Sequence, residues 1–281
     1  ERKYINVQHE DSNGDVTAKL YSQIVNPDTR LVTILHASPV TGISVDLEAI
    51  AAAIRSIAPE AFIIVDGVQY AAHGGIKIDK YNIDGYAISP YKMYSRHGYG
   101  FAWVSDRLTQ MRHEQLLDGP DENWELGTRD TGSYATLSDV VKYLEWLGGK
   151  IKNTHSGSVK LYNAAKAIAA QETALTELLI NGEDNIKGLK DLKGIEIIGG
   201  EKNLNRKGLV SFRINGIPSQ VLVGFLNDKG IRTHVRKADH YSGNILDPLG
   251  WEDCVRVSVC HYNSSEEIKS LLLALNEFQL D

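Results

Sequence analysis

The sequence predicts an α/β protein in two parts: a mostly parallel sheet with helices on both faces, then a smaller α+β domain. Two observations favour this class. Short apolar runs alternate with helical stretches in the first half, as in sheets whose parallel strands are joined by crossover helices. After the Gly-Gly-Lys sequence at 148–150 the order changes to paired strands separated by helices. We therefore place the domains at residues 1–150 and 151–281.

The first part should contain four strands, because four short runs are rich in branched or aromatic side chains. These runs are residues 30–35, 61–65, 86–89 and 100–104. Apolar residues at helical spacing predict helices over 46–57 and 136–147. Strands and helices in this alternation predict a largely parallel sheet.

The second part should open with a long helix and continue with two pairs of strands, each pair followed by a helix. The long helix is expected at 158–179, the strands at 195–198, 209–214, 231–235 and 255–260, and the intervening helix at 220–226. A capping box marks the start of the last helix, since Ser264 stands three residues before Glu267.

The composition excludes several classes of protein. Of the 281 residues, 42% are hydrophobic and 23% charged, and the net charge of −6 argues against nucleic-acid binding, which needs a basic surface. No apolar run approaches the roughly 20 residues of a membrane span, and the opening Glu1-Arg2-Lys3 does not resemble a signal peptide. Two cysteines are too few for a disulfide framework, so we expect a cytoplasmic setting.

Histidine and cysteine do not occur at the spacing of metal ligands. The four histidines that invite such an interpretation are His36, His73, His97 and His261. None has a second histidine or cysteine at ligand spacing, so we expect no metal site.

Three side chains with chemical potential follow predicted strands. Asp66 ends one strand, Gln69 follows three residues later, and Lys92 comes after the next strand. Singly, an aspartate here is usually a turn former and a lysine a solvated charge. Ligands of open α/β sheets, however, bind outside the carboxyl ends of the strands. Together the three meet the needs of pyridoxal phosphate: an amine for a Schiff base, a carboxylate for the pyridine nitrogen and a hydrogen bond at the ring oxygen.

The run from Val65 to Ser105 resembles the core of the class V aminotransferase and cysteine desulfurase superfamily, which are pyridoxal-phosphate enzymes of fold type I. The family pattern is D-x-x-Q, then S-x-H-K and G-x-G. Three further matches stand in the family's order: residues 36–42 (HASPVTG) resemble H-x-S-N-x-x-G, residues 125–128 (ELGT) resemble E-x-G-T, and residues 255–263 contain R-x-S followed by YN.

The resemblance implies a role for each matched residue near the cofactor. Asp66 would pair with the pyridine nitrogen, and Gln69 would contact the ring hydroxyl. Lys92 would form the Schiff base and then shuttle protons. Ser89 and Tyr91 would hold the phosphate, with Tyr91 standing where many relatives have histidine.

Two more roles follow from the resemblance. Thr128 would reach the phosphate in the partner subunit, which implies a homodimer. Arg256 would bind the α-carboxylate of an amino-acid substrate, a bidentate task that suits a planar guanidinium.

The sequence departs from the family pattern in three places. About a hundred upstream residues would be expected from the resemblance, including a phosphate-binding turn and a ring-stacking residue. Pro39 replaces the family's asparagine and has no side-chain donor. Residues 233–246, which would carry the nucleophilic cysteine of a desulfurase, contain none; Cys254 and Cys260 instead flank Arg256, and strict alternation would point all three to one face.

We therefore expect an enzyme acting on an amino acid, of the lyase, epimerase or aminotransferase type, that forms no protein persulfide. The cysteine-free loop offers other groups that could shape the substrate site: His234, Arg236, His240 and Tyr241. One alternative is a desulfurase-like enzyme with an unusual nucleophile. A second is a catalytically inactive dimerisation or regulatory protein, which the missing upstream part favours and the intact Asp66, Gln69, Lys92 and Arg256 oppose.

Overall fold

The computed structural model describes residues 16–120 and 123–278. Its chain forms two compact units. The parallel-sheet unit comprises Tyr21–His36 and Asp46–Ala165, and the antiparallel-sheet unit comprises Ala37–Val45, the chain from Lys166 onward and the described residues up to Leu20. The division predicted near residue 150 stays a prediction. The opening Glu1-Arg2-Lys3, expected not to be a signal peptide, lies outside the described residues.

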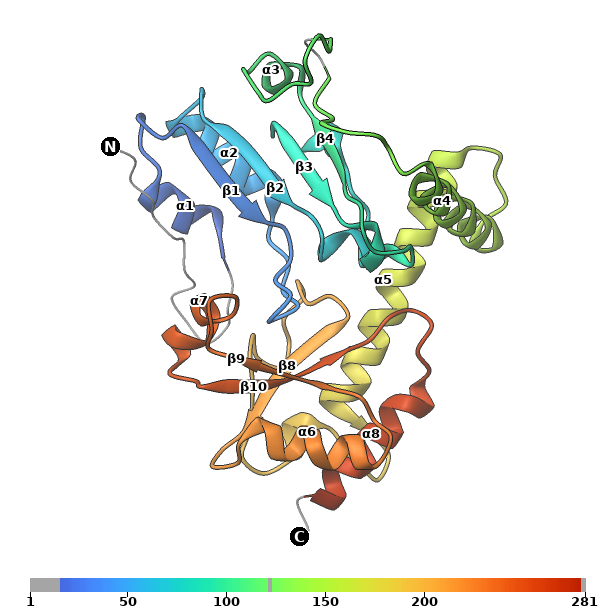
Figure 1. The fold of residues 1–281 in the computed structure, drawn as a ribbon. Helices are drawn as coiled ribbons and strands as arrows, with labels where there is room; N and C mark the ends of the chain where they lie inside the picture. Colours follow the sequence, from blue (N-terminus) through green and yellow to red (C-terminus); the bar gives the residue numbers. More distant parts are fainter. Residues whose placement is uncertain (1–15, 121–122, 279–281) are drawn as a thin grey trace. The chain divides into compact units, whose positions relative to one another are not determined.

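The parallel-sheet unit is built on four strands in the order β1-β2-β3-β4 (Figure 1). These are β1 (Leu31–Leu35), β2 (Phe62–Asp66), β3 (Gly85–Ile88) and β4 (Phe101–Val104). The first three strands are parallel and β4 runs antiparallel to β3. The four predicted strands and the mostly parallel sheet are confirmed.

Helices and short 3₁₀ turns connect these strands. They are α1 (Ala18–Ile24), α2 (Leu47–Ile57), η1 (Tyr70–Ala72), η2 (Ile78–Lys80), η3 (Pro90–Met93), α3 (Asp106–Thr109), α4 (Thr131–Ile151) and α5 (Gly157–Asn181). The α4 helix starts five residues before the predicted 136 because Asp130 caps it, accepting a hydrogen bond from the Ser133 N–H at 3.3 Å. The α1 and α5 helices each run from one unit into the other.

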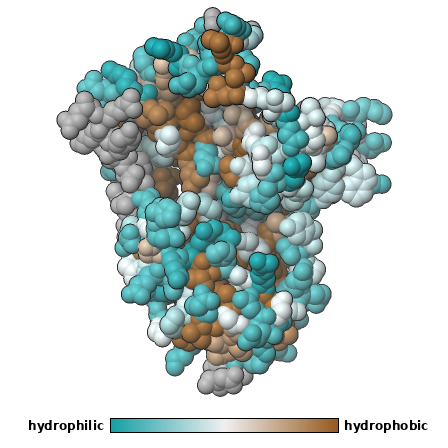
Figure 2. Space-filling view, in the orientation of Figure 1, coloured by the Kyte–Doolittle hydropathy of each residue, from teal (hydrophilic) through white to brown (hydrophobic). Residues whose placement is uncertain are grey.

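The two faces of the parallel sheet differ. On one face Ile34 and Val65 are buried, and α2, whose Ile50 and Ile54 are also buried, lies behind this face in Figure 1. The opposite face carries a hollow of about 710 Å³ that apolar side chains line. Its lining includes Leu31, Phe62, Ile64, Trp103, Met111 and Trp124. Figure 2 shows apolar side chains gathered over β1 and β2 on this side.

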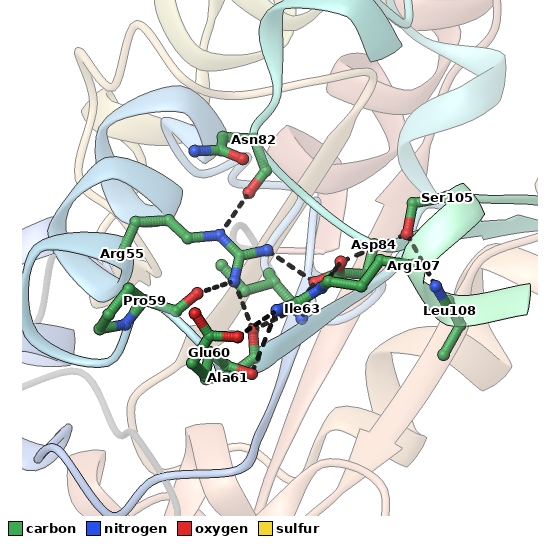
Figure 3. Close-up of polar contacts among 10 residues, drawn as sticks. All are labelled: Arg55, Pro59, Glu60, Ala61, Ile63, Asn82, Asp84, Ser105, Arg107 and Leu108. Carbon is green, nitrogen blue, oxygen red and sulfur yellow. Dashed lines mark hydrogen bonds and ion pairs between the residues drawn. The ribbon is translucent and has the colours of Figure 1, made fainter. Parts of the chain in front are cut away.

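A buried carboxylate joins three segments of the parallel-sheet unit (Figure 3). Asp84, whose side chain is 4% exposed, accepts hydrogen bonds from Arg55 at 2.6 Å and from two nitrogens of Arg107 at 3.0 Å each. It also accepts one from the Ile63 N–H at 2.9 Å. Asp84 therefore ties α2, β2 and the start of α3 to the loop before β3.

The antiparallel-sheet unit contains a four-stranded sheet in the order β7-β8-β10-β9. Its elements are β7 (Ile195–Ile197), β8 (Leu209–Ile214), α6 (Ser219–Asp228), β9 (His234–Lys237), α7 (Gly243–Leu246), η5 (Asp247–Leu249), β10 (Asp253–Ser258) and α8 (Ser265–Phe278), preceded by the short β5 (Gly182–Glu183), β6 (Ile186–Lys187) and η4 (Leu189–Asp191). One face packs Phe212 and Val255 against α6 and α8 in the unit's core. The predicted capping box is present, because Ser264 and Glu267 exchange hydrogen bonds between side chain and backbone.

Two predicted strands are displaced. The strand predicted at 231–235 is β9 at His234–Lys237, because the Ile231 N–H closes a turn onto the Leu226 carbonyl at the end of α6. The strand predicted at 255–260 is β10 at Asp253–Ser258. Cys260 therefore lies beyond the strand, and the expectation that strict alternation places it on the Arg256 face is wrong.

Candidate active site

Asp66, Gln69 and Lys92 meet at the carboxyl edge of the parallel sheet. Asp66 is the last residue of β2 and pairs in register with Ala87 of β3, so the segments that follow the two strands start side by side. Lys92 lies in η3, directly after β3, and its Nζ donates to Oε1 of Gln69 at 2.9 Å. The Gln69 Nε2 lies 3.1 Å from Nε2 of His73. Gln69 thus holds the lysine amine on one side and a buried imidazole on the other.

The Asp66 carboxylate is exposed at this edge. Its Oδ1 accepts a hydrogen bond from the Val68 N–H at 2.9 Å. No other residue in the described ranges donates to it, so the carboxylate has lone pairs available for a further donor. A protonated ring nitrogen is a donor of this kind.

An aromatic cluster of His36 with Tyr70 and Tyr86, two tyrosines that sequence analysis did not single out, lies next to the end of β2. His36 stacks on Tyr70, with ring centroids 3.6 Å apart, and its Nδ1 lies 2.8 Å from the Tyr86 hydroxyl. The His36 N–H donates to the Asp66 carbonyl at 2.9 Å. A signal for this packing exists at Gly67, where a Cβ would lie 2.1 Å from the Tyr86 ring. Only glycine leaves room at this position for the Tyr86 ring.

Burial keeps both phenols protonated. It raises the pKa of Tyr70 to about 12, with a smaller contribution from Tyr81. Burial also raises the pKa of Tyr86, with additional contributions from Tyr81, Tyr70 and Asp66. The protonated Tyr86 hydroxyl forms a hydrogen bond with Nδ1 of His36 at 2.8 Å.

The residues expected to hold the phosphate lie next to Lys92 in the chain. Ser89 is the N-cap residue of η3 and is half-buried, and its side chain makes no capping hydrogen bond. Tyr91 is 40% exposed and stacks on His97 with ring centroids 4.3 Å apart. Thr128 is exposed in the segment before α4. Their phosphate-binding roles stay predictions.

Arg256 lies in the other unit, on β10. Its Nη1 donates to the carbonyl of Pro39 at 3.0 Å, and Ser211, its register partner on β8, donates to the Val40 carbonyl. The proline that replaces the family's asparagine therefore contacts the arginine through its backbone. Burial, and to a smaller extent the neighbouring charge of Arg236, lower the pKa of Arg256 to about 10.

Neither cysteine is placed as a nucleophile. Cys254 is fully buried on β10, and burial raises the pKa of its thiol to about 11. Burial also raises the pKa of the half-buried Cys260 thiol. Because the thiolate is the reactive form, the raised pKa values lower the reactivity of both thiols.

The described residues contain no group of three or more histidine, cysteine, aspartate or glutamate side chains placed to hold a metal ion. Within the same ranges, no helix combines the length and apolar character needed to cross a membrane.

The fold and the site together define a class of protein. A mostly parallel sheet, with an aspartate ending one strand and a lysine following the next, is the arrangement of pyridoxal-phosphate-dependent proteins of fold type I. The chain belongs to the aminotransferase class-V family, whose profile matches residues 3–271. Members of this family depend on pyridoxal phosphate, and the amine, amide and carboxylate gathered at one sheet edge fit that group.

Individual relatives agree with this assignment. The chain is 27% identical over 282 residues to a probable cysteine desulfurase of Pseudomonas putida, covering 95% of this chain and 63% of that protein. It is 30% identical over 256 residues to the aminotransferase-like protein FGM3 of Gibberella zeae, covering 88% and 58%. The chain thus spans about three-fifths of the length of these relatives.

A solved structure shares the fold. The apo cysteine desulfurase from Thermococcus onnurineus NA1 superposes with a TM-score of 0.77 at 21% identity, covering 97% of this chain and 65% of that one.

Proposed function

We propose that this chain carries the lysine, the ring-nitrogen carboxylate and the substrate arginine of a pyridoxal-phosphate enzyme that acts on an amino acid. The observation that carries the proposal is the 2.9 Å hydrogen bond from Lys92 Nζ to Gln69, at the sheet edge where Asp66 ends β2. A lysine with only a solvating role would not need the hydrogen bond that positions Lys92 at this edge. We further propose a cytoplasmic homodimer in which the exposed Thr128 reaches the partner's phosphate site.

The chain's residues divide the work among them. Bound pyridoxal phosphate supplies an electron sink for the charge that develops at the substrate α-carbon. Asp66 would hold the proton on the ring nitrogen, and Gln69 would position the Lys92 amine. Lys92 Nζ would remove the α-proton and return it, while Arg256 would bind the α-carboxylate. Lyase, epimerase and aminotransferase reactions all share this first proton transfer.

A cofactor titration tests the proposal. Adding pyridoxal phosphate to the purified chain should produce a yellow absorption band, and borohydride reduction followed by peptide mapping should place the label on Lys92. A label on another lysine would refute the assignment. A chain that stays colourless would instead support the inactive dimerisation or regulatory protein.

Asp66→Asn is expected to retain pyridoxal phosphate but to lose about 10- to 100-fold in turnover, the range of one charge-assisted hydrogen bond. The neutral amide cannot hold the pyridinium charge. Spectroscopic titration gives the affinity and initial rates give the turnover. Asp79→Asn, on the exposed η2 of the same unit, is the matched control. Unchanged turnover in Asp66→Asn would remove Asp66 from the site.

The second candidate function is a cysteine desulfurase-like reaction. The names of the bacterial and archaeal relatives favour it over a lyase, epimerase or aminotransferase reaction that forms no protein persulfide. A desulfurase needs a reactive thiolate on a mobile loop. Residues 233–246 contain no cysteine, and burial raises the pKa of both thiols in the chain. The positions of the cysteines therefore oppose the persulfide reaction that the relatives' names suggest.

Combined substitution of Cys254→Ser and Cys260→Ser separates the two candidates. We expect turnover to stay within about threefold of the unsubstituted chain, with a stability loss of roughly 1–3 kcal/mol because a hydroxyl replaces the buried Cys254 thiol. Initial rates and urea denaturation measure the two effects. Loss of turnover in a folded variant that still binds pyridoxal phosphate would establish the desulfurase reading.

A further inference from the structure

A second arginine lies beside Arg256 on the same face of the antiparallel sheet. In the β9–β10 register Arg256 pairs with His234 and Cys254 pairs with Arg236, so the two arginines are diagonal neighbours. Diagonal residues of an antiparallel pair lie about 7–8 Å apart, within reach of long side chains. The face opposite packs into the apolar core through Val255 and Val235. The two guanidiniums thus lie on the other face of the sheet, which also carries Cys254 of a smaller buried cluster with Ile198, Leu246 and Trp251.

No acidic side chain among the described residues forms an ion pair with Arg236. Its Nε is buried without a hydrogen-bond partner, and its guanidinium forms no hydrogen bond or ion pair with any residue in the described ranges. The Arg256 Nε is likewise buried and unpartnered, and that side chain is satisfied at one nitrogen by Pro39. Each arginine therefore retains donors that the fold does not use.

Two other arginines of this unit form the contacts expected of arginines with a structural role. Arg213, on the same face, forms an ion pair with Glu196 at 2.9 Å and lies over the Trp251 ring at 4.3 Å. Arg206 donates to the carbonyls of Ile198 and Gly200. The Nη2 of Arg213 and both Nη atoms of Arg206 are therefore bound to protein oxygens. Arg236 differs because no carboxylate or carbonyl among the described residues binds its guanidinium.

Two like charges brought together without an anion destabilise a fold, and neutral side chains would serve the packing better. An anion shared between the guanidiniums removes that cost. Under the proposed function Arg256 takes the α-carboxylate, which leaves the Arg236 fork for a second acidic group on the same small molecule.

We propose that Arg236 binds the acidic side-chain group of the substrate, so that the substrate is an amino acid with an acidic side chain. The assignment of the α-carboxylate to Arg256 rests on the proposed function. The Arg236 guanidinium would then determine specificity. Removing it should lower the affinity for acidic substrates and leave the affinity for neutral ones nearly unchanged.

The probes are L-aspartate and its neutral isostere L-asparagine, bound to the full chain with and without pyridoxal phosphate and measured by calorimetry. The unsubstituted chain should bind L-aspartate at least tenfold more tightly. Arg236→Gln should remove that preference and leave L-asparagine affinity within about twofold, while Arg256→Gln should weaken both ligands. Arg232→Gln, an exposed arginine just before β9, is the matched control and should change neither.

Three results would overturn the inference: no preference in the unsubstituted chain, a preference that survives Arg236→Gln, or equal weakening of both ligands in that variant. If Arg236→Gln does not fold, Arg236→Lys must lower the preference at least threefold, and an unchanged preference would also refute it. Preference for L-aspartate that Arg236→Gln abolishes in a chain unable to bind pyridoxal phosphate would refute the proposed function and retain the acidic-group site.

Discussion

Lys92→Ala is expected to abolish covalent binding of pyridoxal phosphate and to lower turnover by roughly 10³-fold or more. The reason is that the same amine would both bind the cofactor and transfer the α-proton. Alanine also leaves Gln69 without the donor that its Oε1 accepts at 2.9 Å. The yellow band should be absent and borohydride should fix no cofactor to the chain. Initial rates with a saturating amino-acid substrate complete the measurement.

Lys80→Ala provides the matched control for this prediction. Lys80 lies in η2 of the same unit, and its side chain is exposed. It should keep the band and the turnover of the unsubstituted chain. A Lys92→Ala variant that still forms a borohydride-reducible adduct would show that another lysine binds the cofactor.

Asp84→Asn is expected to lower the free energy of unfolding by about 3–5 kcal/mol, the usual cost of breaking a buried ion pair by removing one partner. Asparagine fits the same space but leaves Arg55 without its ion-pair partner and Arg107 with only the exposed Glu60 at 3.5 Å (Figure 3). Urea denaturation measures the loss. Asp139→Asn breaks an exposed pair with Lys142 and should cost less than about 1 kcal/mol.

The pH dependence of this effect has a definite sign. Burial raises the pKa of Asp84, but hydrogen bonds from Arg107, the Ile63 N–H and Arg55 lower it by more, so the net pKa lies below its ordinary value. A depressed carboxyl pKa stabilises the fold above the unfolded pKa, about 3.9, and this contribution is lost as the pH falls through the folded pKa. The stability gap between the unsubstituted chain and Asp84→Asn should therefore narrow below about pH 4. A gap that is constant down to pH 3 would show that Asp84 acts through packing alone.

Local sequence determined the elements that carry the candidate site. The apolar run ending at Asp66 predicts a buried strand with a carboxylate at its carboxyl end, and the next run predicts a strand followed by Lys92. The capping box at Ser264 likewise determines where α8 begins. These features depend on side-chain periodicity and capping over a few residues, which a sequence displays directly.

Tertiary structure alone decided which groups touch. Parallel pairing of β2 with β3 brings Gln69 to Lys92 across 23 positions, and the antiparallel register of β9 and β10 places Arg236 diagonal to Arg256. The strand predicted at 231–235 illustrates this, because β9 begins three residues later, at His234, and extends to Lys237. Register is set by hydrogen bonds and packing between distant segments, and a shift of one residue turns every side chain to the other face of the sheet. The diagonal placement of Arg236 and Arg256 is therefore a property of the folded sheet, which no local pattern in either strand contains.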